Sequence, residues 1–433
     1  MSEITKRRLL IIILATSLLP CLLLLRFPEL VTPHSVGLWG SAVLGYMGIV
    51  LLLWMYILGA KAVMGKVFYD LAPVLRIHKA LGKYGTLLIF AHPLLVTYSY
   101  GEQLFYSVIP NISTQASRHI LLGQIAIWLL AIVWVTSALI RKRLSWRAWR
   151  YLHWLAYIAI PFALLHVPDL GSQTQAHRIV KGYLFLLMLT FAVVSAVRLL
   201  SIFNIDRTRY RIKTVVQLTS LDTLLTLMPA ANGRLKPRLG QYVYIKLGML
   251  SEDHPFSVVH SDQNTGEIWL AFRHAGMYTQ QLEQLGVGQT VYLSGPYGSF
   301  TSSLADTDTA PVVYIAGGIG ITPFVDRILM DAGAREQWLF DANRTRELAV
   351  LYQPLKEMLG DRAIAIYNQP SDTLQPGEEP GVISAEILSR YLIDPTRYRY
   401  FICGPPPMMT AVSQLLQSLE VPKKNIEIEK FGW

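Results

Sequence analysis

Cysteine and charged residues are both scarce in this 433-residue sequence, which has only two cysteines and 16% charged residues. Cys21 lies in an apolar run near the N-terminus and Cys403 lies in the distant, more polar half, so we expect no disulfide between them. Two cysteines also exclude a disulfide framework and a cysteine-rich zinc site. The shortage of charge accompanies a hydrophobic content of 52%, and the long apolar runs are concentrated in residues 1–200.

Six apolar runs in this first part are each close to the ~20 residues with which a helix crosses a bilayer. The first run has the basic start of a signal peptide, but no small-residue cleavage site follows it, so we expect it to remain as a membrane span. The six predicted spans are residues 9–26, 37–59, 77–98, 120–140, 149–167 and 180–200.

The net charge of +10 fits this membrane topology. Basic residues gather before the first span, around the start of the third, between the fourth and fifth and after the sixth. The alternate loops, 26–37, 99–119 and 168–178, contain few. By the positive-inside rule, the N-terminus and the C-terminal half lie in the cytoplasm. The charge is thereby explained by topology, and we expect no nucleic-acid partner.

Two of the predicted spans carry paired histidines. His78 and His92 lie fourteen residues apart in the third span, and His153 and His166 lie thirteen residues apart in the fifth. Both spans cross the membrane in the same direction, so two histidines lie at an inner level and two at an outer level, roughly 20 Å apart. Neutral imidazole is a good iron ligand, and a pair on facing helices can hold a haem. The four histidines therefore predict two stacked b-type haems.

The two histidine spacings differ in helical phase. Fourteen α-helical residues end about 40° from the starting face, whereas thirteen end about 140° from it. Pro161 lies between His153 and His166, and a proline can kink or re-phase a membrane helix. We therefore expect Pro161 to correct the phase of the fifth span.

The second half of the chain alternates strand-like stretches with glycine-rich turns. The strand PVVYI leads directly into the turn AGGIGITPF at 316–324 and then into a helical stretch. This order places backbone N–H groups where a phosphate can bind. A later strand, YRYFICG at 398–404, leads into CGPPPMM and another helix, as expected at the carboxyl edge of a parallel sheet.

Four motifs, in the order HPFS (254–257), GPYG (295–298), AGGIGITPF and CGPPPMM, resemble the ferredoxin–NADP reductase superfamily. With the four histidines added, nearly the whole chain resembles the NADPH oxidase and ferric reductase family. The resemblance implies a six-helix transmembrane bis-haem bundle at residues 1–204, an antiparallel β-barrel FAD domain at 205–304 and an α/β parallel-sheet NAD(P)H domain at 305–433. The chain begins a few residues before its first span, which resembles a minimal bacterial-type oxidase without a calcium-binding segment or a required regulatory subunit.

The resemblance also implies which residues bind the cofactors. Ser257 would face the flavin, Arg273 would hold the FAD pyrophosphate, and Cys403 would place its thiol near the hydride path. The residues implied for FAD are His254, Pro255, Phe256, Ser257, Arg273, Gly276 and Thr279. Those implied for the nicotinamide nucleotide groove are Gly317, Gly318, Gly320, Thr322, Pro323, Gly404 and Pro405.

Two assignments within the resemblance stay open. Arg344 is the candidate for the adenosine 2′-phosphate, although Arg346 competes with it and Asp341 leaves both NADPH and NADH as the donor. Phe431 matches the terminal aromatic residue that stacks on the flavin in this family, and Trp433 is the alternative.

The implied activity is that of a superoxide-forming NAD(P)H oxidase, a flavocytochrome b in the plasma (inner) membrane. Electrons would pass from cytoplasmic NAD(P)H through FAD to the inner haem (His78, His153), then to the outer haem (His92, His166) and to O₂. Reduction of ferric or cupric chelates is an alternative, as is electron donation to a partner protein on the outer side. A membrane-tethered reductase without haem is the remaining alternative.

Overall fold

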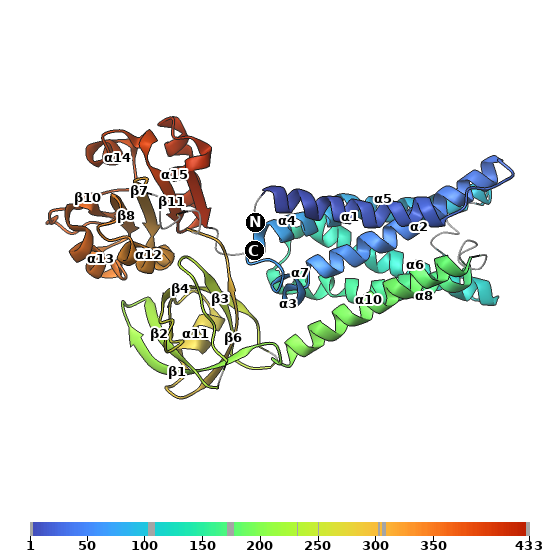
Figure 1. Ribbon diagram of the computed structural model, residues 1–433, viewed down its shortest axis with the longest axis horizontal. Coiled ribbons are helices and arrows are strands. Elements are labelled where there is room, and N and C mark those ends of the chain that lie inside the picture. Colours follow the sequence, from blue (N-terminus) through green and yellow to red (C-terminus); the bar gives the residue numbers. More distant parts are fainter. Residues whose placement is uncertain are drawn as a thin grey trace. The chain divides into compact units, whose positions relative to one another are not determined.

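The computed structural model describes residues 3–102, 109–170, 177–231, 233–249, 251–301, 304 and 309–429. The chain divides into two compact units, Met1–Leu200 and Ser201–Trp433 (Figure 1). The first is a bundle of long helices, here called the membrane unit. The second contains all the strands of the described part and is here called the reductase unit.

Six helical stretches of the membrane unit are long and apolar enough to cross a bilayer, which confirms the predicted six-helix architecture. Several of them are built from more than one segment. In chain order they are α1 (Glu3–Leu24); α2 (Pro33–Leu58), followed by the short α3 (Lys61–Met64); α4 (Ala72–Ala80), the π-helical segment η1 (Leu81–Gly85) and α5 (Thr86–Ser99); α6 (Gln115–Trp134), the π-helical η3 (Val135–Leu139) and the 3₁₀ turn η4 (Arg141–Arg143); α7 (Trp146–His153) and α8 (Leu155–Leu170); and α10 (Arg178–Ile202).

Polar caps fix where two of these helices begin. The Thr32 hydroxyl accepts a hydrogen bond from the Ser35 backbone N–H (3.1 Å), and Ser35 Oγ accepts one from the Thr32 N–H (3.0 Å). Thr114 and Ser117 make the same reciprocal pair at the start of α6 (3.1 and 2.9 Å). Each pair satisfies N–H groups that the first helical turn leaves free.

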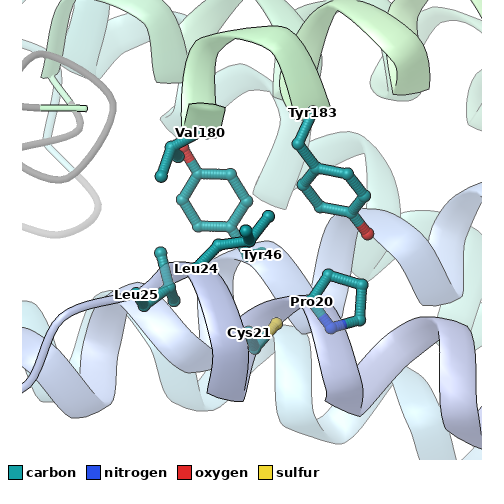
Figure 2. Close-up of a pocket in the computed structure, with 7 residues that line it drawn as sticks. All are labelled: Pro20, Cys21, Leu24, Leu25, Tyr46, Val180 and Tyr183. Atoms are coloured by element: carbon teal, nitrogen blue, oxygen red, sulfur yellow. The ribbon is translucent and has the colours of Figure 1, made fainter. Parts of the chain in front are cut away.

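The bundle keeps apolar side chains both inside and outside. Leu52, Ile89, Leu130 and Ile160 pack in its core, while large side chains of α1 and α10 are exposed, as Leu23 is at 78%. Exposed apolar side chains on long helices match a lipid environment. A narrow apolar crevice between α1, α2 and α10 contains no charged group (Figure 2); its lining residues are Pro20, Cys21, Leu24, Leu25, Tyr46, Val180 and Tyr183.

The reductase unit begins with a closed barrel of six strands in the order β1-β2-β5-β4-β3-β6, in which all neighbours are antiparallel. Side chains alternate between core and surface, so Tyr210 and Ile212 of β1 are buried on either side of an exposed residue. The elements are β1 (Thr208–Gln217), β2 (Asp222–Pro229), β3 (Tyr242–Lys246), β4 (His254–Ser261), β5 (Ile268–Arg273), α11 (Met277–Glu283) and β6 (Thr290–Tyr297).

A parallel six-stranded sheet follows, in the order β10-β9-β8-β7-β11-β12. All six residues of β7 are buried, because Tyr314 packs on one face of the sheet and Val313 and Ile315 on the other. The chain moves outward from β7 to β10 and then returns to the other side of β7, so the topological switch point lies between β7 and β11.

The strands of this sheet are β7 (Val312–Gly317), β8 (Gln337–Asn343), β9 (Ala363–Tyr367), β10 (Glu378–Pro380), β11 (Arg399–Cys403) and β12 (Ile426–Glu429). Its helices are α12 (Val325–Met330), α13 (Tyr352–Leu359), α14 (Ala385–Tyr391) and α15 (Pro406–Ser418). The 3₁₀ turns are η5 (Gly318–Phe324), η6 (Arg346–Leu348), η7 (Gly360–Arg362), η8 (Pro395–Arg397) and η9 (Lys423–Asn425). Barrel and sheet together confirm the predicted fold class of the second half.

Candidate functional site

Two of the four predicted histidines face each other within the membrane unit. His78 lies on α4 and His153 is the last residue of α7, and their ring centres are 6.1 Å apart at an interplanar angle of 71°. Two imidazoles bound on opposite sides of one metal ion, each through a bond of about 2 Å, have ring centres roughly 6 Å apart. The pair therefore has room for one iron between the rings.

Each of the four histidines has its Nδ1 atom turned to an oxygen atom of another helix. Three of these oxygens are backbone carbonyls, and the fourth is a hydroxyl that can donate or accept. They are Met55 O for His78 (2.9 Å), Ser41 O for His92 (2.7 Å), His119 O for His166 (2.8 Å) and Ser137 Oγ for His153 (3.3 Å). A carbonyl oxygen only accepts, so in three of the four cases Nδ1 carries the proton and Nε2 presents its lone pair. Such a bond is the usual orienting partner of a metal-ligating histidine.

Glycines on the neighbouring helices make room for three of these rings. A Cβ atom on Gly123 would lie 2.7 Å from Cε1 of His166, one on Gly45 would lie 3.0 Å from Cε1 of His92, and one on Gly59 would lie 3.3 Å from Cε1 of His78. Helix and imidazole can approach this closely only where the side chain is a hydrogen atom. The signal in the sequence is glycine inside apolar helices, but which histidine each glycine faces follows only from the packing.

The phase difference between the two spans is resolved in the third span. The segment η1 between His78 and His92 is π-helical, and its i→i+5 bonds take one residue more than an α-helix for the same rotation. Fourteen residues across it thus correspond to thirteen α-helical residues, about 140° from the starting face, as in the fifth span. Pro161 lies inside α8, which continues past it, so the expected correction at Pro161 is wrong.

The fifth span has its irregularity at Trp154, between α7 and α8. The N–H of Trp154 still donates to Arg150 O at 3.1 Å, so the helical path continues through this position. Trp149, one turn before His153, stacks on its ring with centres 5.0 Å apart and donates from Nε1 to Ser137 Oγ (3.0 Å). Ser137 thus contacts both His153 and the indole that packs on it.

The four histidines suit an axial pair at each level better than a metal site made of protein alone. Among the residues that the structure describes, no three or more His, Cys, Asp or Glu side chains gather where they could share a metal ion. Two imidazoles with free Nε2 atoms match the ligand demand of a haem iron, whose other four ligands come from the porphyrin. The spacing of His78 and His153 therefore fits a b-type haem at the inner level, and His92 and His166 offer the same donor type at the outer level.

In the barrel, the two motifs implied for FAD lie next to each other. His254 begins β4 and its ring stacks on Tyr278 of α11, with ring centres 3.7 Å apart, while Phe256 also stacks on Tyr278 at 6.3 Å. Tyr278 donates to Ile245 O (2.7 Å), and burial raises the pKa of its phenol. Pro255 and Ser257 lie between and beyond these rings on β4.

The turn before α11 is closed by Thr279. Its Oγ1 accepts hydrogen bonds from the N–H groups of Ala275 (3.0 Å) and Gly276 (3.1 Å). Arg273, at the end of β5, is tied to Asp222 through two bonds, Nε to Oδ1 (2.8 Å) and Nη2 to Oδ2 (2.9 Å). The third nitrogen, Nη1, lies 2.7 Å from where a Cβ atom on Gly318 would stand, and the φ of +55° at Gly318 itself favours glycine.

In the sheet, the residues implied for the nicotinamide groove come together at the carboxyl ends of β7 and β11. A Cβ atom on Gly317 would lie 2.5 Å from Met408 Sδ and 2.9 Å from Pro405 Cδ, and one on Gly320 would collide with the carbonyl of Cys403. This is the topological switch point, where open α/β sheets bind their ligands. Gly318, Gly320, Thr322 and Pro323 all lie in η5, and Gly404 joins β11 to Pro405 before α15.

Three family models match consecutive parts of the chain. A ferric reductase-like transmembrane component matches residues 44–164, an oxidoreductase FAD-binding domain matches 209–302 and an oxidoreductase NAD-binding domain matches 314–414. In this combination of domains the chain is similar to the ferric reductase and NADPH oxidase-like family. The ferric reductase-like component includes His78, His92 and His153, and the two reductase domains coincide with the barrel and the parallel sheet.

Curated relatives are similar to about half of the chain. The reductase component of propane 2-monooxygenase from Mycolicibacterium smegmatis is 27% identical over 52% of this chain and 68% of its own length; the corresponding protein from Rhodococcus jostii is 26% identical over 52% and 64%. The chain thus spans about two-thirds of the length of these relatives. Among solved structures, the ferredoxin reductase in carbazole 1,9a-dioxygenase is similar at 21% identity and a TM-score of 0.46, over 52% of this chain and 69% of that chain.

In the FAD-binding domain, sequence reasoning missed Asp222. Asp222 and Arg273 are direct partners in the register of β2 and β5, and the Asp222 side chain is fully buried. The Nε and Nη2 atoms of Arg273 therefore bind the Asp222 carboxylate. Its Nη1 atom faces Gly318 instead. The pairing depends on strand register, which the sequence alone does not reveal.

In the NAD-binding domain, the two candidate arginines differ in their surroundings. Arg346 is bound by Glu378 through Nε (2.7 Å) and Nη2 (2.5 Å), whereas Arg344 is exposed just after β8. Asp341 is fully buried and accepts a bond from Asn343 Nδ2 (2.8 Å); burial raises the pKa of its carboxyl to about 8. Asp341 is therefore buried and protonated at neutral pH, whereas Arg344 is at the surface.

Cys403 is also fully buried, and burial raises the pKa of its thiol well above the ordinary value, so the thiol is protonated at neutral pH. Its backbone carbonyl closely approaches Gly320, whereas its thiol is buried in the core of the sheet. Phe431 and Trp433, the candidates for the flavin-stacking ring, lie outside the described residues.

Proposed function

We propose that the protein is a transmembrane NAD(P)H oxidase that carries electrons from NAD(P)H to O₂ on the other side of the membrane and forms superoxide. The observation that carries the proposal is the set of four histidines, each oriented by a bond to Nδ1, in a chain that also has FAD- and NAD-binding domains. Such a chain combines a two-electron donor site with a membrane path that one electron at a time can follow.

The cofactors would supply the redox chemistry, since FAD accepts a hydride and releases single electrons and a b-type haem passes on one electron at a time. His78 and His153 would hold the inner haem through their Nε2 atoms, and His92 and His166 the outer one. The residues at the start of β4 and in the turn before α11 would hold FAD. Residues of η5, together with Cys403, Gly404 and Pro405, which lie next to it, would hold the nicotinamide nucleotide.

Superoxide is the proposed product because histidine would fill both axial positions at the outer level, which leaves O₂ no place on the iron. Each NAD(P)H supplies two electrons and a proton, and two O₂ molecules each accept one electron. The basic residues at the ends of the helices support a cytoplasmic N-terminus and reductase unit, and the plasma membrane is the proposed site of action.

NAD(P)H-driven reduction of cytochrome c by the purified protein, with and without superoxide dismutase, tests the proposal. We expect dismutase to abolish most of the rate. His92→Leu should lose one of two haems and the dismutase-sensitive rate, while NAD(P)H still reduces the flavin. His34→Ala is the matched control, because His34 bonds Ser99 O near the start of α2 and belongs to neither histidine pair.

A rate that dismutase leaves unchanged contradicts superoxide formation. The match to a ferric reductase-like component then favours the second candidate, reduction of ferric or cupric chelates, which a chelate-dependent and dismutase-insensitive rate would show. The resemblance to reductase components of monooxygenases favours a third, electron donation to a partner protein. A wild-type protein without haem would rule out all three membrane routes.

A further inference from the structure

Arg198 is a cation inside the last membrane helix. It lies on α10, a turn before the helix ends at Ile202, and it is half-buried. A charged side chain within a span is costly and almost always faces the bundle interior and a partner. Its position near a helix end would allow the guanidinium to reach outward to water. Its contacts are instead with side chains and backbone of other helices of the bundle.

Two tyrosines enclose the guanidinium. Its central carbon lies 4.5 Å from the ring centre of Tyr157 and 5.0 Å from that of Tyr56, distances typical of cation–π contacts. Nη2 donates to the Tyr157 hydroxyl, Nη1 lies 3.5 Å from Tyr56 O, and the Tyr56 hydroxyl bonds Ser195 Oγ (2.9 Å). Among the described residues, every group that Arg198 contacts is thus neutral, and no carboxylate balances its positive charge.

The two tyrosines belong to the surroundings of the inner histidine pair. Tyr157 follows His153 by four residues, one helical turn along the fifth span. Tyr56 follows Met55, whose carbonyl accepts the bond from His78 Nδ1. The charge of Arg198 interacts electrostatically with both His78 and His153. Tyr56 and Tyr157 therefore connect the cation to the surroundings of both inner histidines.

We propose that Arg198 binds a propionate carboxylate of the inner haem, with Tyr56 and Tyr157 as the walls that hold the guanidinium in place. The inference rests on the proposed function, since it requires a haem between His78 and His153. A haem between His78 and His153 would bring its propionate carboxylates into the membrane unit near Arg198. The planar guanidinium of arginine binds a carboxylate through two parallel hydrogen bonds. Arg198 would thus be a positioning residue that fixes the rotation of the porphyrin about the His–Fe–His axis.

The test compares Arg198→Gln, Arg198→Lys and Lys181→Gln with the wild type, as full chains purified with their haems. Lys181 is an exposed cation near the other end of α10 and serves as the control. A cation beside a haem favours the reduced form, so we expect Arg198→Gln to shift one of the two Fe(III)/Fe(II) equilibria about tenfold toward the oxidised form, which is ~59 mV for a one-electron couple. The other haem should keep its potential, and Lys181→Gln should change neither.

Arg198→Lys separates charge from geometry. It keeps the cation but loses the fork, so the potential should stay closer to that of the wild type while the propionate bending band in the resonance Raman spectrum shifts. Because lysine is the conservative variant, this measurement stands even if Arg198→Gln fails to fold.

Unchanged potentials and an unchanged propionate band in both Arg198 variants would overturn the inference. So would loss of a co-purified phospholipid from Arg198→Gln with both haem signals intact, because the anion would then be a lipid phosphate. Wild-type protein that contains no haem refutes the proposed function itself, whereas two haems that are indifferent to Arg198 refute only this inference.

Discussion

We expect substitution of Gly123 by alanine to weaken binding of the outer haem. Among the three glycines that face a histidine ring, Gly123 should show the largest effect. Gly123 lies on α6 opposite His166, and an added Cβ atom would stand 2.7 Å from both Cε1 and Nδ1 of that ring. The ring cannot yield freely, because its Nδ1 is bonded to His119 O at 2.8 Å. The added methyl group must therefore either break this hydrogen bond or displace Nε2 of His166.

The size of the effect follows from the contact distances. Carbon atoms pack comfortably at ~3.5–4.0 Å, so the ring and the helix must separate by roughly 1 Å. Overpacking of this kind costs about 1–3 kcal/mol. If the cost falls on the bound state, the affinity for the outer haem drops by about 5- to 150-fold.

A graded series of glycine-to-alanine variants measures this reasoning. The added Cβ would lie 3.0 Å from His92 at Gly45 and 3.3 Å from His78 at Gly59, and it would meet nothing within 4 Å at Gly182. We expect haem loss to decrease in the order Gly123, Gly45, Gly59, with none at Gly182→Ala, which controls for the higher helix propensity of alanine. The assay is haem per polypeptide from the pyridine haemochrome spectrum, together with a redox titration that resolves the two levels.

The reasoning fails if Gly123→Ala keeps two haems per chain with unaltered spectra. It also fails if Gly182→Ala loses haem as readily as Gly123→Ala, because the loss would then come from the backbone and not from the imidazole contact. Loss of the inner haem from Gly123→Ala would contradict the assignment of His166 to the outer level.

Three further predictions concern the reductase unit. Arg344→Gln should raise the KM for NADPH about 10- to 150-fold, the worth of a charge-assisted bond to phosphate of ~1.5–3 kcal/mol, and leave the KM for NADH unchanged. Arg346→Gln should leave both KM values unchanged, because Glu378 holds this arginine. Equal effects of Arg344→Gln on both nucleotides would exclude a 2′-phosphate contact. The raised pKa of Asp341, about 8, means that the folded chain keeps a proton which the unfolded chain releases above about pH 4. The free energy of unfolding should therefore fall as pH rises through this window, and Asp341→Asn should flatten the dependence of the melting temperature between pH 5 and 8, a result that an unchanged slope would contradict. Cys403 is buried with a raised thiol pKa, so it should resist maleimide at pH 7.5 until the protein is denatured, and stoichiometric labelling of Cys403 in the folded protein would show that the thiol is reachable.

The sequence predicted the elements better than it predicted their partners. Hydropathy located the six spans, because length and apolar composition alone decide whether a helix can cross a bilayer. It did not reveal the π segment Leu81–Gly85, since a one-residue change in helical repeat leaves no mark in composition. The phase difference was visible in the spacing of the histidines, but it was placed at Pro161 in the wrong span.

The candidate site was predictable where a motif places its own residues side by side. The glycines of η5 and the segment after β11 meet because parallel strands end at one edge. The partners of Arg273 and of the histidines were not predictable in this way. Asp222 reaches Arg273 through strand register, and Gly45, Gly59 and Gly123 reach their imidazoles through helix packing; both depend on contacts between distant segments.

Helix α2 contributes none of the four paired histidines, yet it contacts a histidine of the third span at both levels. Its carbonyls at Ser41 and Met55 hold His92 and His78, and these two carbonyls are separated by fourteen residues, about 21 Å of α-helix. The distance between these two backbone oxygens therefore sets the distance between the two histidine rings that bond them. One residue inserted between them would lengthen this distance by ~1.5 Å and turn one carbonyl by about 100° away from its histidine, so the separation of the two histidine levels depends on a helix that supplies none of the four paired histidines.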